Sequence, residues 1–320
     1  MSKTRRGCLE RGGALGLALV GGPLGGCIHV GVRDQPRTTV RVGSKPFAEQ
    51  EILGSLAYER LQHVDGIQVV NEIGYGGSLA NWEAVVAGTK DLYWEYTGTA
   101  WSRLPPRHTE RITEPERLYE LVAADARAQG VRMGEPAPFS NEWVLVADRE
   151  WSERTGVTTI GGLADHIDDG DTDFGIALNE DFYHREDAWN GVADYYGIDS
   201  EVRTNLEAGT FIVTSAGLTY ELLRDGRVQV ASGFATDPQL DRPSVVELDD
   251  DRDYFLPYQP MPTVHAPTAE SYPEILETLA PIAAALDGST IRRLNRRVLV
   301  EDHQPGTVAR SYLEQLGEAT

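Results

Sequence analysis

Residues 38–73 read TTVRVGSKPFAEQEILGSLAYERLQHVDGIQVVNEI, and their pattern indicates the class of fold. The first residues alternate β-branched and polar side chains, which predicts a strand over residues 39–42. Residues 49–61 then place Leu53, Leu56 and Leu61, together with Ile52, on one face of a helix. Residues 67–73 are again typical of a strand. The sequence therefore predicts a β-α-β opening, the unit from which parallel sheets are built.

The same alternation of strand and helix continues beyond this opening. Helical patterns at 79–87 and 116–129 alternate with strand candidates at 92–94 and 143–147. A second set begins near residue 141, with strand candidates at 174–177 and 228–231 and helical stretches at 186–196 and 217–224. The last third, at 272–286, 290–298 and 306–316, is largely helical and is expected to pack on the first lobe. We therefore predict an α/β fold with mainly parallel sheets, whose ligand cleft lies beyond the carboxyl ends of the strands.

The charge balance excludes one class of partner. The 320 residues include 29 basic and 50 acidic side chains, a net charge of −21, which repels nucleic-acid phosphates and anionic membrane surfaces. Only three of the basic residues are lysines, Lys3, Lys45 and Lys90. Dispersed acidic residues with few lysines resemble the surfaces of halophilic proteins, because very high salt screens their mutual repulsion. The charge thus indicates habitat more than ligand.

The N-terminus has the order of features of an exported lipoprotein. The pair Arg5-Arg6 precedes an apolar, glycine-rich run at 12–22 that is too short to span a bilayer, which predicts a twin-arginine signal peptide over residues 1–26. Leu24-Gly25-Gly26-Cys27 resembles a lipobox, so Cys27 is the predicted lipidation site. The alternative is a basic, flexible tail with an accidental cysteine. Lipoprotein processing is favoured because the positive charge, the apolar run, the small residues and the cysteine occur in the required order.

Processing at Cys27 would leave a tethered body outside the cytoplasm. Residues 27–37 would form the lipidated linker, and no later stretch approaches 18 consecutive apolar residues. Removal of four basic and one acidic residue leaves a mature charge near −24, with Cys27 as the only cysteine and hence no intrachain disulfide. We expect a lipid-anchored protein on the outer face of the cytoplasmic membrane.

Two segments suggest a binding site. Gly43-Ser44-Lys45-Pro46-Phe47 follows the first strand and places Lys45 where a cleft is expected, although a surviving surface lysine remains the alternative. In the segment 92–100, LYWEYTGTA, three aromatic residues close a strand and are followed by Thr97-Gly98-Thr99, which core packing alone does not require.

These motifs resemble the glycine betaine/choline-binding family of ABC importers. The resemblance rests on the segment from Gly43 to Gln50, the Gly76-Gly77 loop and Glu95-Tyr96-Thr97-Gly98-Thr99, and it extends from about residue 38 to the C-terminus. Further matches occur in the family's order: Asp181-Phe182-x-x-Arg185, Phe234-Ala235-Thr236-Asp237, Phe255-Leu256-Pro257-Tyr258 and Leu294-Asn295. Separately each motif is weak, and jointly they are specific.

The resemblance implies a two-lobed periplasmic-binding-protein fold of type II, closed over its ligand by a hinge. The expected division is 38–139 with 244–320 for lobe I and 140–243 for lobe II. The implied function is a monomeric receptor that delivers glycine betaine, or a related quaternary-ammonium osmoprotectant, to a membrane permease with a separate ATPase.

The resemblance also implies the residues that receive the ammonium group. A quaternary ammonium has no N–H to donate, so recognition requires aromatic ring faces, worth about 2 kcal/mol per desolvated contact. The family's ring positions correspond to Tyr96, Trp143, Phe234 and Tyr258. Trp143 and Phe234 depart from the family's tyrosines, which leaves the preferred ligand open and keeps core packing as an alternative for both.

For the ligand's carboxylate, the resemblance assigns Lys45, Arg185 and the hydroxyl of Thr99, with the backbone carbonyl of Asn141 placed against the ammonium. Arg185 has an alternative as a surface partner of Asp181 or Glu186.

Catalytic and metal signatures are missing from the sequence. The seven histidines show no metal-ligand spacing, the acidic run 165–173 does not fit a calcium loop, and there is no nucleophile elbow or phosphate-binding loop. We therefore expect no cofactor and no enzymatic activity. Two alternatives remain: a receptor for another small zwitterion such as an amino acid, which a pocket-facing Glu95 or Glu142 would favour, and an extracellular two-lobed enzyme.

Overall fold

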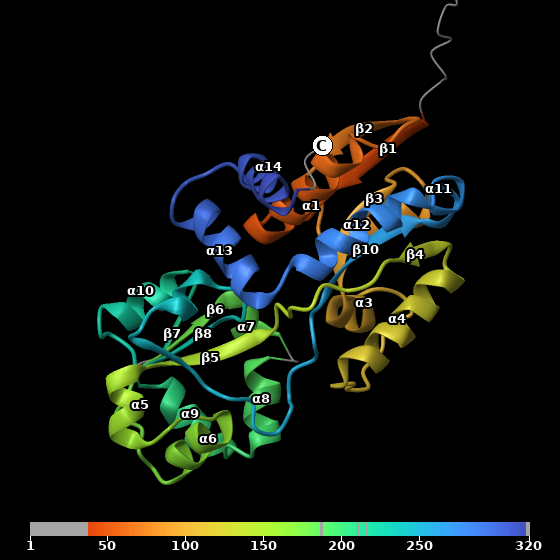
Figure 1. Ribbon diagram of the computed structural model, residues 1–320. Coiled ribbons are helices and arrows are strands. Elements are labelled where there is room, and N and C mark those ends of the chain that lie inside the picture. Colours follow the sequence, from red (N-terminus) through yellow and green to blue (C-terminus); the bar gives the residue numbers. More distant parts are fainter. Residues whose placement is uncertain (1–37, 186–187, 210, 216, 318–320) are drawn as a thin grey trace, which may run out of the picture. The chain divides into compact units, whose positions relative to one another are not determined.

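The computed structural model describes residues 38–185, 188–209, 211–215 and 217–317 (Figure 1). The expected signal peptide, the lipidation site Cys27 and the linker lie outside the described residues. Among the helices that the structure describes, none is long and apolar enough to cross a lipid bilayer.

The first sheet contains five strands in the order β2-β1-β3-β10-β4. Their bounds are β1 (Thr38–Gly43), β2 (Ile67–Glu72), β3 (Leu92–Tyr96), β4 (Val131–Met133) and β10 (Pro260–His265). Strand β1 is parallel to β2 and β3, whereas β10 is antiparallel to both β3 and β4. The predicted β-α-β opening is thus confirmed, but the sheet as a whole is mixed.

The second sheet repeats this arrangement in the order β7-β6-β8-β5-β9. Its strands are β5 (Trp143–Asp148), β6 (Ile176–Asn179), β7 (Phe211–Thr214), β8 (Val230–Phe234) and β9 (Val245–Glu247). Strand β6 is parallel to β7 and β8, and β5 is antiparallel to β8 and β9. The antiparallel strand of each sheet, β10 or β5, follows a passage of the chain from the other sheet. The α/β fold with two lobes is confirmed.

Strand β9 differs from the expected division of the chain. The expectation assigns residue 244 onward to lobe I, whereas β9 pairs with β5, and Leu248 and Tyr254 are buried in the core of the second lobe. The chain returns to the first sheet only at β10.

Strand β10 was not predicted from the sequence, because it contains Pro260 and Pro262, which have no backbone N–H to donate to a neighbouring strand. Their carbonyls are still used: Gly134 N donates to Pro262 O at 2.8 Å and Ala137 N to Pro260 O at 2.9 Å.

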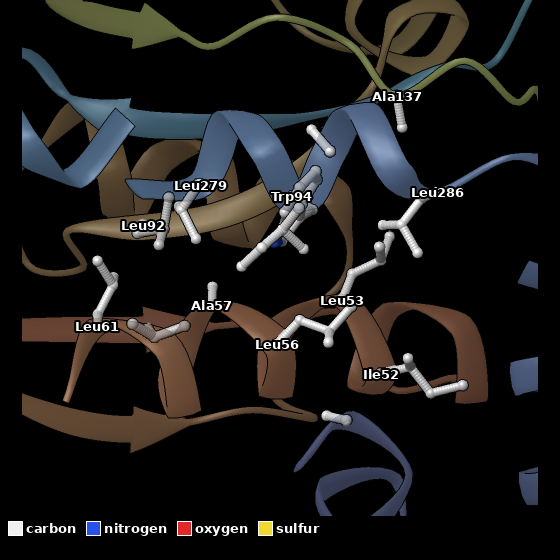
Figure 2. Close-up of a cluster of buried hydrophobic side chains, with 14 of the residues drawn as sticks. Ile52, Leu53, Leu56, Ala57, Leu61, Leu92, Trp94, Ala137, Leu279 and Leu286 are labelled. Atoms are coloured by element: carbon white, nitrogen blue, oxygen red, sulfur yellow. The ribbon is translucent and has the colours of Figure 1, made fainter. Parts of the chain in front are cut away.

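Helices cover the first sheet and build its core. They are α1 (Ala48–Leu61), α2 (Ser78–Val86), α3 (Thr97–Arg103), α4 (Pro115–Ala128), α11 (Ala266–Ser271), α12 (Glu274–Ala285), α13 (Gly288–Leu299) and α14 (Pro305–Leu316). The predicted apolar face of α1 packs with Leu92 and Trp94 of β3 and with Leu279 of α12, all fully buried. Figure 2 shows side chains of these three elements meeting in this cluster. The C-terminal helices α12 to α14 therefore complete the core of the first lobe.

The second lobe has its own core around Leu145, Phe182 and Trp189. Its helices are α5 (Arg149–Thr155), α6 (Ile160–Asp168), α7 (Glu180–His184), α8 (Trp189–Tyr196), α9 (Ser200–Glu207) and α10 (Leu218–Arg224), with a short 3-10 turn η1 (Pro238–Asp241) after β8. Side-chain caps begin three of the longer helices: Thr159 accepts from Gly162 N, Asp199 from Val202 N, and Asp287 of the first lobe from Thr290 N.

Candidate ligand-binding site

One cavity of about 650 Å³ collects the candidate residues from both lobes. All eight candidates within the described residues line it: Lys45, Tyr96, Thr99, Asn141, Trp143, Arg185, Phe234 and Tyr258. The volume is in the range of cavities that hold small molecules. The ninth candidate, Cys27, was predicted for lipidation and lies outside the described part of the chain.

The strand ends explain why these residues meet. Tyr96 is the last residue of β3 and Phe234 the last residue of β8, while Lys45 lies between β1 and α1. Arg185 directly follows α7, the helix after β6. Each of these positions follows the carboxyl end of a parallel strand, where α/β folds place their ligands. The similar strand order of the two sheets lets each lobe contribute one such edge to the cavity.

Trp143 and Phe234 form a joint aromatic wall. They are direct cross-strand partners in the antiparallel pair of β5 and β8, and their ring centroids lie 4.2 Å apart at an interplanar angle of 29°. Trp143 also contacts Phe182, with centroids 5.1 Å apart. Since the two rings stack on each other, a cation cannot lie between them. They can offer it only their outward faces and edges.

The Thr97-Gly98-Thr99 motif positions Tyr258. Thr97 Oγ1 donates to Pro257 O at 2.8 Å and accepts from Gln259 N at 3.0 Å, so it fixes the backbone on both sides of Tyr258. At Gly98, a Cβ atom would lie 2.9 Å from the Tyr258 ring, which is closer than van der Waals contact allows. The glycine is therefore required by the close approach of this ring. Thr99 lines the cavity.

Lys45 has a protein partner that the sequence did not indicate. Its ammonium pairs with the carboxylate of Glu95, which is fully buried. Glu95 also accepts from Tyr93 OH at 3.1 Å and from Tyr96 N at 2.8 Å. The Lys45 Nζ lies 4.7 Å from the centroid of the Tyr96 ring. A ligand carboxylate would therefore meet a lysine whose charge is already balanced by Glu95.

Arg185 supplies the other predicted cation. Its Cζ lies 5.9 Å from the centroid of the Trp143 ring. Its backbone N donates to Asp181 O at 3.1 Å, which closes the last turn of α7. Asp181 also lines the cavity, which therefore contains an acidic side chain besides the guanidinium of Arg185.

Glu49 is a cavity residue that sequence reasoning missed. It lies in the first turn of α1, is 3% exposed and accepts hydrogen bonds from Tyr96 OH at 2.7 Å, Asn141 Nδ2 at 3.0 Å and Asn295 Nδ2 at 3.0 Å. Burial raises the pKa of the Glu49 carboxyl, and its hydrogen bonds oppose that rise. Asn141 therefore meets Glu49 through its side chain; the expectation named its backbone carbonyl.

Other acidic and polar residues that were not predicted also line the cavity. Asp237 accepts from Phe234 N at 2.8 Å, and burial raises the pKa of its carboxyl to about 6. Asn295 donates to Thr236 O at 3.1 Å, which joins α13 to the end of β8. The signal for these residues was present, because Glu49, Asp237 and Asn295 belong to the motifs that carry the family resemblance. Nothing in the sequence pattern of these motifs indicated that the three side chains face the cavity.

The two glutamates expected to mark a different ligand do not line this cavity. Glu95 is buried and forms an ion pair with Lys45. Glu142 accepts a hydrogen bond from Ser140 Oγ at 2.8 Å and lines a separate cavity of about 420 Å³. Burial raises the pKa of the Glu142 carboxyl, and the nearby Glu247 raises it further. Within the part of the chain that the structure describes, no group of three histidine, cysteine or acidic residues is arranged to hold a metal ion.

Two α/β lobes of equal strand order with a ligand-sized cavity lined by both define a solute-binding protein of the periplasmic-binding-protein class. Residues 38–315 match the model of the substrate-binding domain of ABC-type glycine betaine transport systems. The chain belongs to this family, as the sequence motifs predicted. Family members bind substrate for a transporter, which agrees with the prediction that the chain is not an enzyme.

Relatives with established names support the assignment. The chain is 30% identical to the chemotactic signal transduction system substrate-binding protein CosB of Halobacterium salinarum over 272 residues, 83% of this chain and 81% of the relative. It is 29% identical to a glycine-betaine-binding protein of Pseudomonas aeruginosa over 283 residues, 87% of this chain and 88% of the relative. The solved structure of apo YehZ from Escherichia coli superposes with a TM-score of 0.70 at 26% identity, covering 88% of this chain and 99% of that one.

Proposed function

We propose that the protein is the lipid-anchored, extracytoplasmic receptor of an ABC importer for glycine betaine or a related quaternary-ammonium osmoprotectant. Cys27 carries the lipid, and the folded body from residue 38 onward binds the ligand outside the cell. The loaded receptor then delivers its ligand to a membrane permease whose ATPase is a separate subunit. Export uses the twin-arginine route.

The observation that carries the ligand class is the aromatic lining of the 650 Å³ cavity. Tyr96 ends strand β3 of the first sheet and Tyr258 lies just before strand β10 of the same sheet. The stacked pair Trp143 and Phe234 comes from the second sheet. A trimethylammonium group is large, permanently charged and unable to donate an N–H bond, so it is recognised by ring faces. In this proposal the carboxylate end of the ligand contacts Arg185 and the hydroxyl of Thr99, with Lys45 nearby.

A second candidate ligand class is another small zwitterion. It is favoured by the carboxylates of Glu49, Asp181 and Asp237, which line the cavity and could accept N–H bonds from an amine. A second candidate partner also follows from the comparisons, since one relative is named as part of a chemotactic signal transduction system. A receptor of that kind would report to a transducer.

Isothermal calorimetry in molar salt tests the ligand class. Titrations of the folded body, residues 38–320 behind a soluble leader, with glycine betaine, choline, carnitine and proline betaine should give saturable binding for at least one compound. Amino acids such as proline and glycine serve as the comparison set. Binding of an amino acid with no response to the quaternary amines would replace the proposal with the second candidate.

The anchor is tested separately in cells. Wild-type protein should fractionate with membranes and incorporate a labelled lipid, and Cys27→Ser should release it from the membrane. Cys8→Ser is the matched control, because Cys8 lies in the expected signal peptide and should have no effect. Membrane association of Cys27→Ser with unchanged lipid labelling would contradict the anchor.

A further inference from the structure

The cavity contains a buried carboxylate that the aromatic-box description does not include. Glu49 is 3% exposed, and the side chains that hydrogen-bond to it all carry an O–H or N–H donor: Tyr96, Asn141, Asn295 and Thr236. An ionised carboxylate only accepts hydrogen bonds, so this set of partners fits a negative charge at Glu49. Charge-assisted bonds of this kind are shorter and stronger than neutral ones.

Glu49 also orients the amide of Asn141, and together with Thr236 O it orients the amide of Asn295. Because both Nδ2 groups are directed at the carboxylate, the carbonyl oxygens point elsewhere. The Oδ1 atoms of Asn141 and Asn295 are buried and accept no hydrogen bond from the described residues. Turning either amide over would bring its oxygen against the carboxylate of Glu49, which is electrostatically unfavourable. Asn141 and Asn295 both line the cavity, and their side chains are thereby held in one orientation beside the charge of Glu49.

Tyr96 couples this charge to the aromatic box. Its hydroxyl donates to Glu49 Oε1 at 2.7 Å, and a phenol bonded to a carboxylate carries more electron density on its ring. The face of such a ring attracts a cation more strongly. The nearby ammonium of Lys45 is paired with Glu95, so its charge is balanced from the other side.

We propose that Glu49 is a specificity-determining residue: its charge and the Tyr96 ring that it polarises make the cavity select a permanent positive charge over an uncharged group of the same shape. This inference rests on the proposed function, since it concerns the quaternary-ammonium end of the same ligand. Shape and hydrophobicity alone would accept a tert-butyl group as readily as a trimethylammonium group.

The test compares each ligand with its carbon isostere. Choline is matched by 3,3-dimethylbutan-1-ol and glycine betaine by 3,3-dimethylbutanoate, which replace the charged nitrogen with carbon. Calorimetry gives the ratio of the two dissociation constants in the wild type and in Glu49→Gln. The matched control is Glu51→Gln, which removes the same charge two residues along α1 from a side chain that does not line the cavity.

We expect Glu49→Gln to lower the preference for the charged ligand about tenfold, equivalent to about 1.4 kcal/mol, while Glu51→Gln leaves it unchanged. An equal ratio in the wild type and Glu49→Gln overturns the inference and leaves the proposed function intact. If the wild type binds no quaternary amine at all, that result contradicts the proposed function.

The ratio of the two dissociation constants separates a role in selectivity from a purely structural role. A structural role would weaken the binding of both ligands of a pair alike and leave their ratio unchanged. If Glu49→Gln does not fold, Tyr96→Phe and Asn141→Ala each remove one donor to Glu49. Each should then lower the same ratio by a smaller factor, and an unchanged ratio in both variants overturns the inference.

Discussion

The ammonium group of Lys45 lies 4.7 Å from the centroid of the Tyr96 ring. The protein thus places a cation of its own on a ring that the ligand's ammonium is proposed to use. Lys45 is held there by its ion pair with the buried Glu95. The other neighbour of Tyr96 is Phe47, whose ring is nearly parallel to it at 6.4 Å between centroids. A ligand cation must therefore approach Tyr96 by a face or edge that these two residues leave open.

The Lys45–Glu95 pair should dominate the stability of this region. Lys45→Met leaves Glu95 as a fully buried carboxylate without its cation, and we expect it to cost about 3 kcal/mol in the free energy of unfolding. The double variant Lys45→Met with Glu95→Gln should recover much of that loss, because neither charge remains buried. Urea unfolding of both single variants and the double variant measures the coupling. Additive effects would show that the pair is not coupled.

Gly98→Ala should weaken ligand binding through Tyr258. The added Cβ would lie 2.9 Å from both the Tyr258 ring and Pro257 O, so the ring must move. We expect an affinity loss of about tenfold, near the value of one displaced cation–π contact. Calorimetry on Gly98→Ala, Tyr258→Ala and the double variant measures it.

Two further variants test whether Gly98→Ala acts through the Tyr258 ring. Gly77→Ala should be silent, since its Cβ would meet no atom within 4 Å and its φ of −76° suits any residue. Gly98→Ala should add little in the Tyr258→Ala background, because the ring that it displaces is already gone. A full tenfold further loss there would show that Gly98 acts by another route.

Asp237 should make the stability of the fold depend on pH. Burial raises the pKa of its carboxyl from 3.8 to about 6, so the folded state binds the proton more tightly than the unfolded state does. Ionising Asp237 therefore costs stability as the pH rises from about 4 to about 6, and the full cost is present above that range. Asp237→Asn should be more stable than the wild type at pH 7, by roughly 1 to 3 kcal/mol, and equal to it near pH 3.5.

Thermal or urea unfolding between pH 3.5 and 7.5 measures this effect. The exposed Asp173→Asn serves as the control and should follow the wild-type profile. If the free energy of unfolding of Asp237→Asn changes between pH 4 and 6 as much as that of the wild type does, Asp237 is not the source of the pH dependence.

Arg111 joins the two lobes at a second point. Its guanidinium carbon lies 4.4 Å from the Tyr195 ring centroid and 4.2 Å from that of Tyr254, while Arg111 itself lies between α3 and α4 of the first lobe. Arg111→Ala removes two cation–π contacts worth about 0.5 to 1 kcal/mol each, so ligand should dissociate several-fold faster. Stopped-flow tryptophan fluorescence measures the rate. The exposed Arg117→Ala is the control, and equal rates in both variants would exclude a contribution of Arg111 to retaining the ligand.

The β-α-β opening and the apolar face of α1 could be predicted from the sequence because local periodicity specifies them. Strand β10 could not, because Pro260 and Pro262 are unfavourable in a ladder, and the donors to their carbonyls, Gly134 N and Ala137 N, come from a distant segment that follows β4. The division of the chain at residue 244 missed β9 for a similar reason. Strand β9 has only three residues, which are too few to show the periodicity of a strand, and its pairing with β5 is a tertiary contact.

Local sequence patterns and composition were enough to predict the alternation of strands and helices, the acidic surface, the family and eight cavity residues. Each of these depends on composition or on residues near one another in the chain. Only the tertiary structure paired Lys45 with Glu95, stacked Trp143 on Phe234 and brought Asn141 and Asn295 to Glu49. Those contacts join residues that lie 50 to 246 positions apart, so no local pattern encodes them. They decide which charges in the cavity are balanced, and hence which end of a ligand each wall can receive.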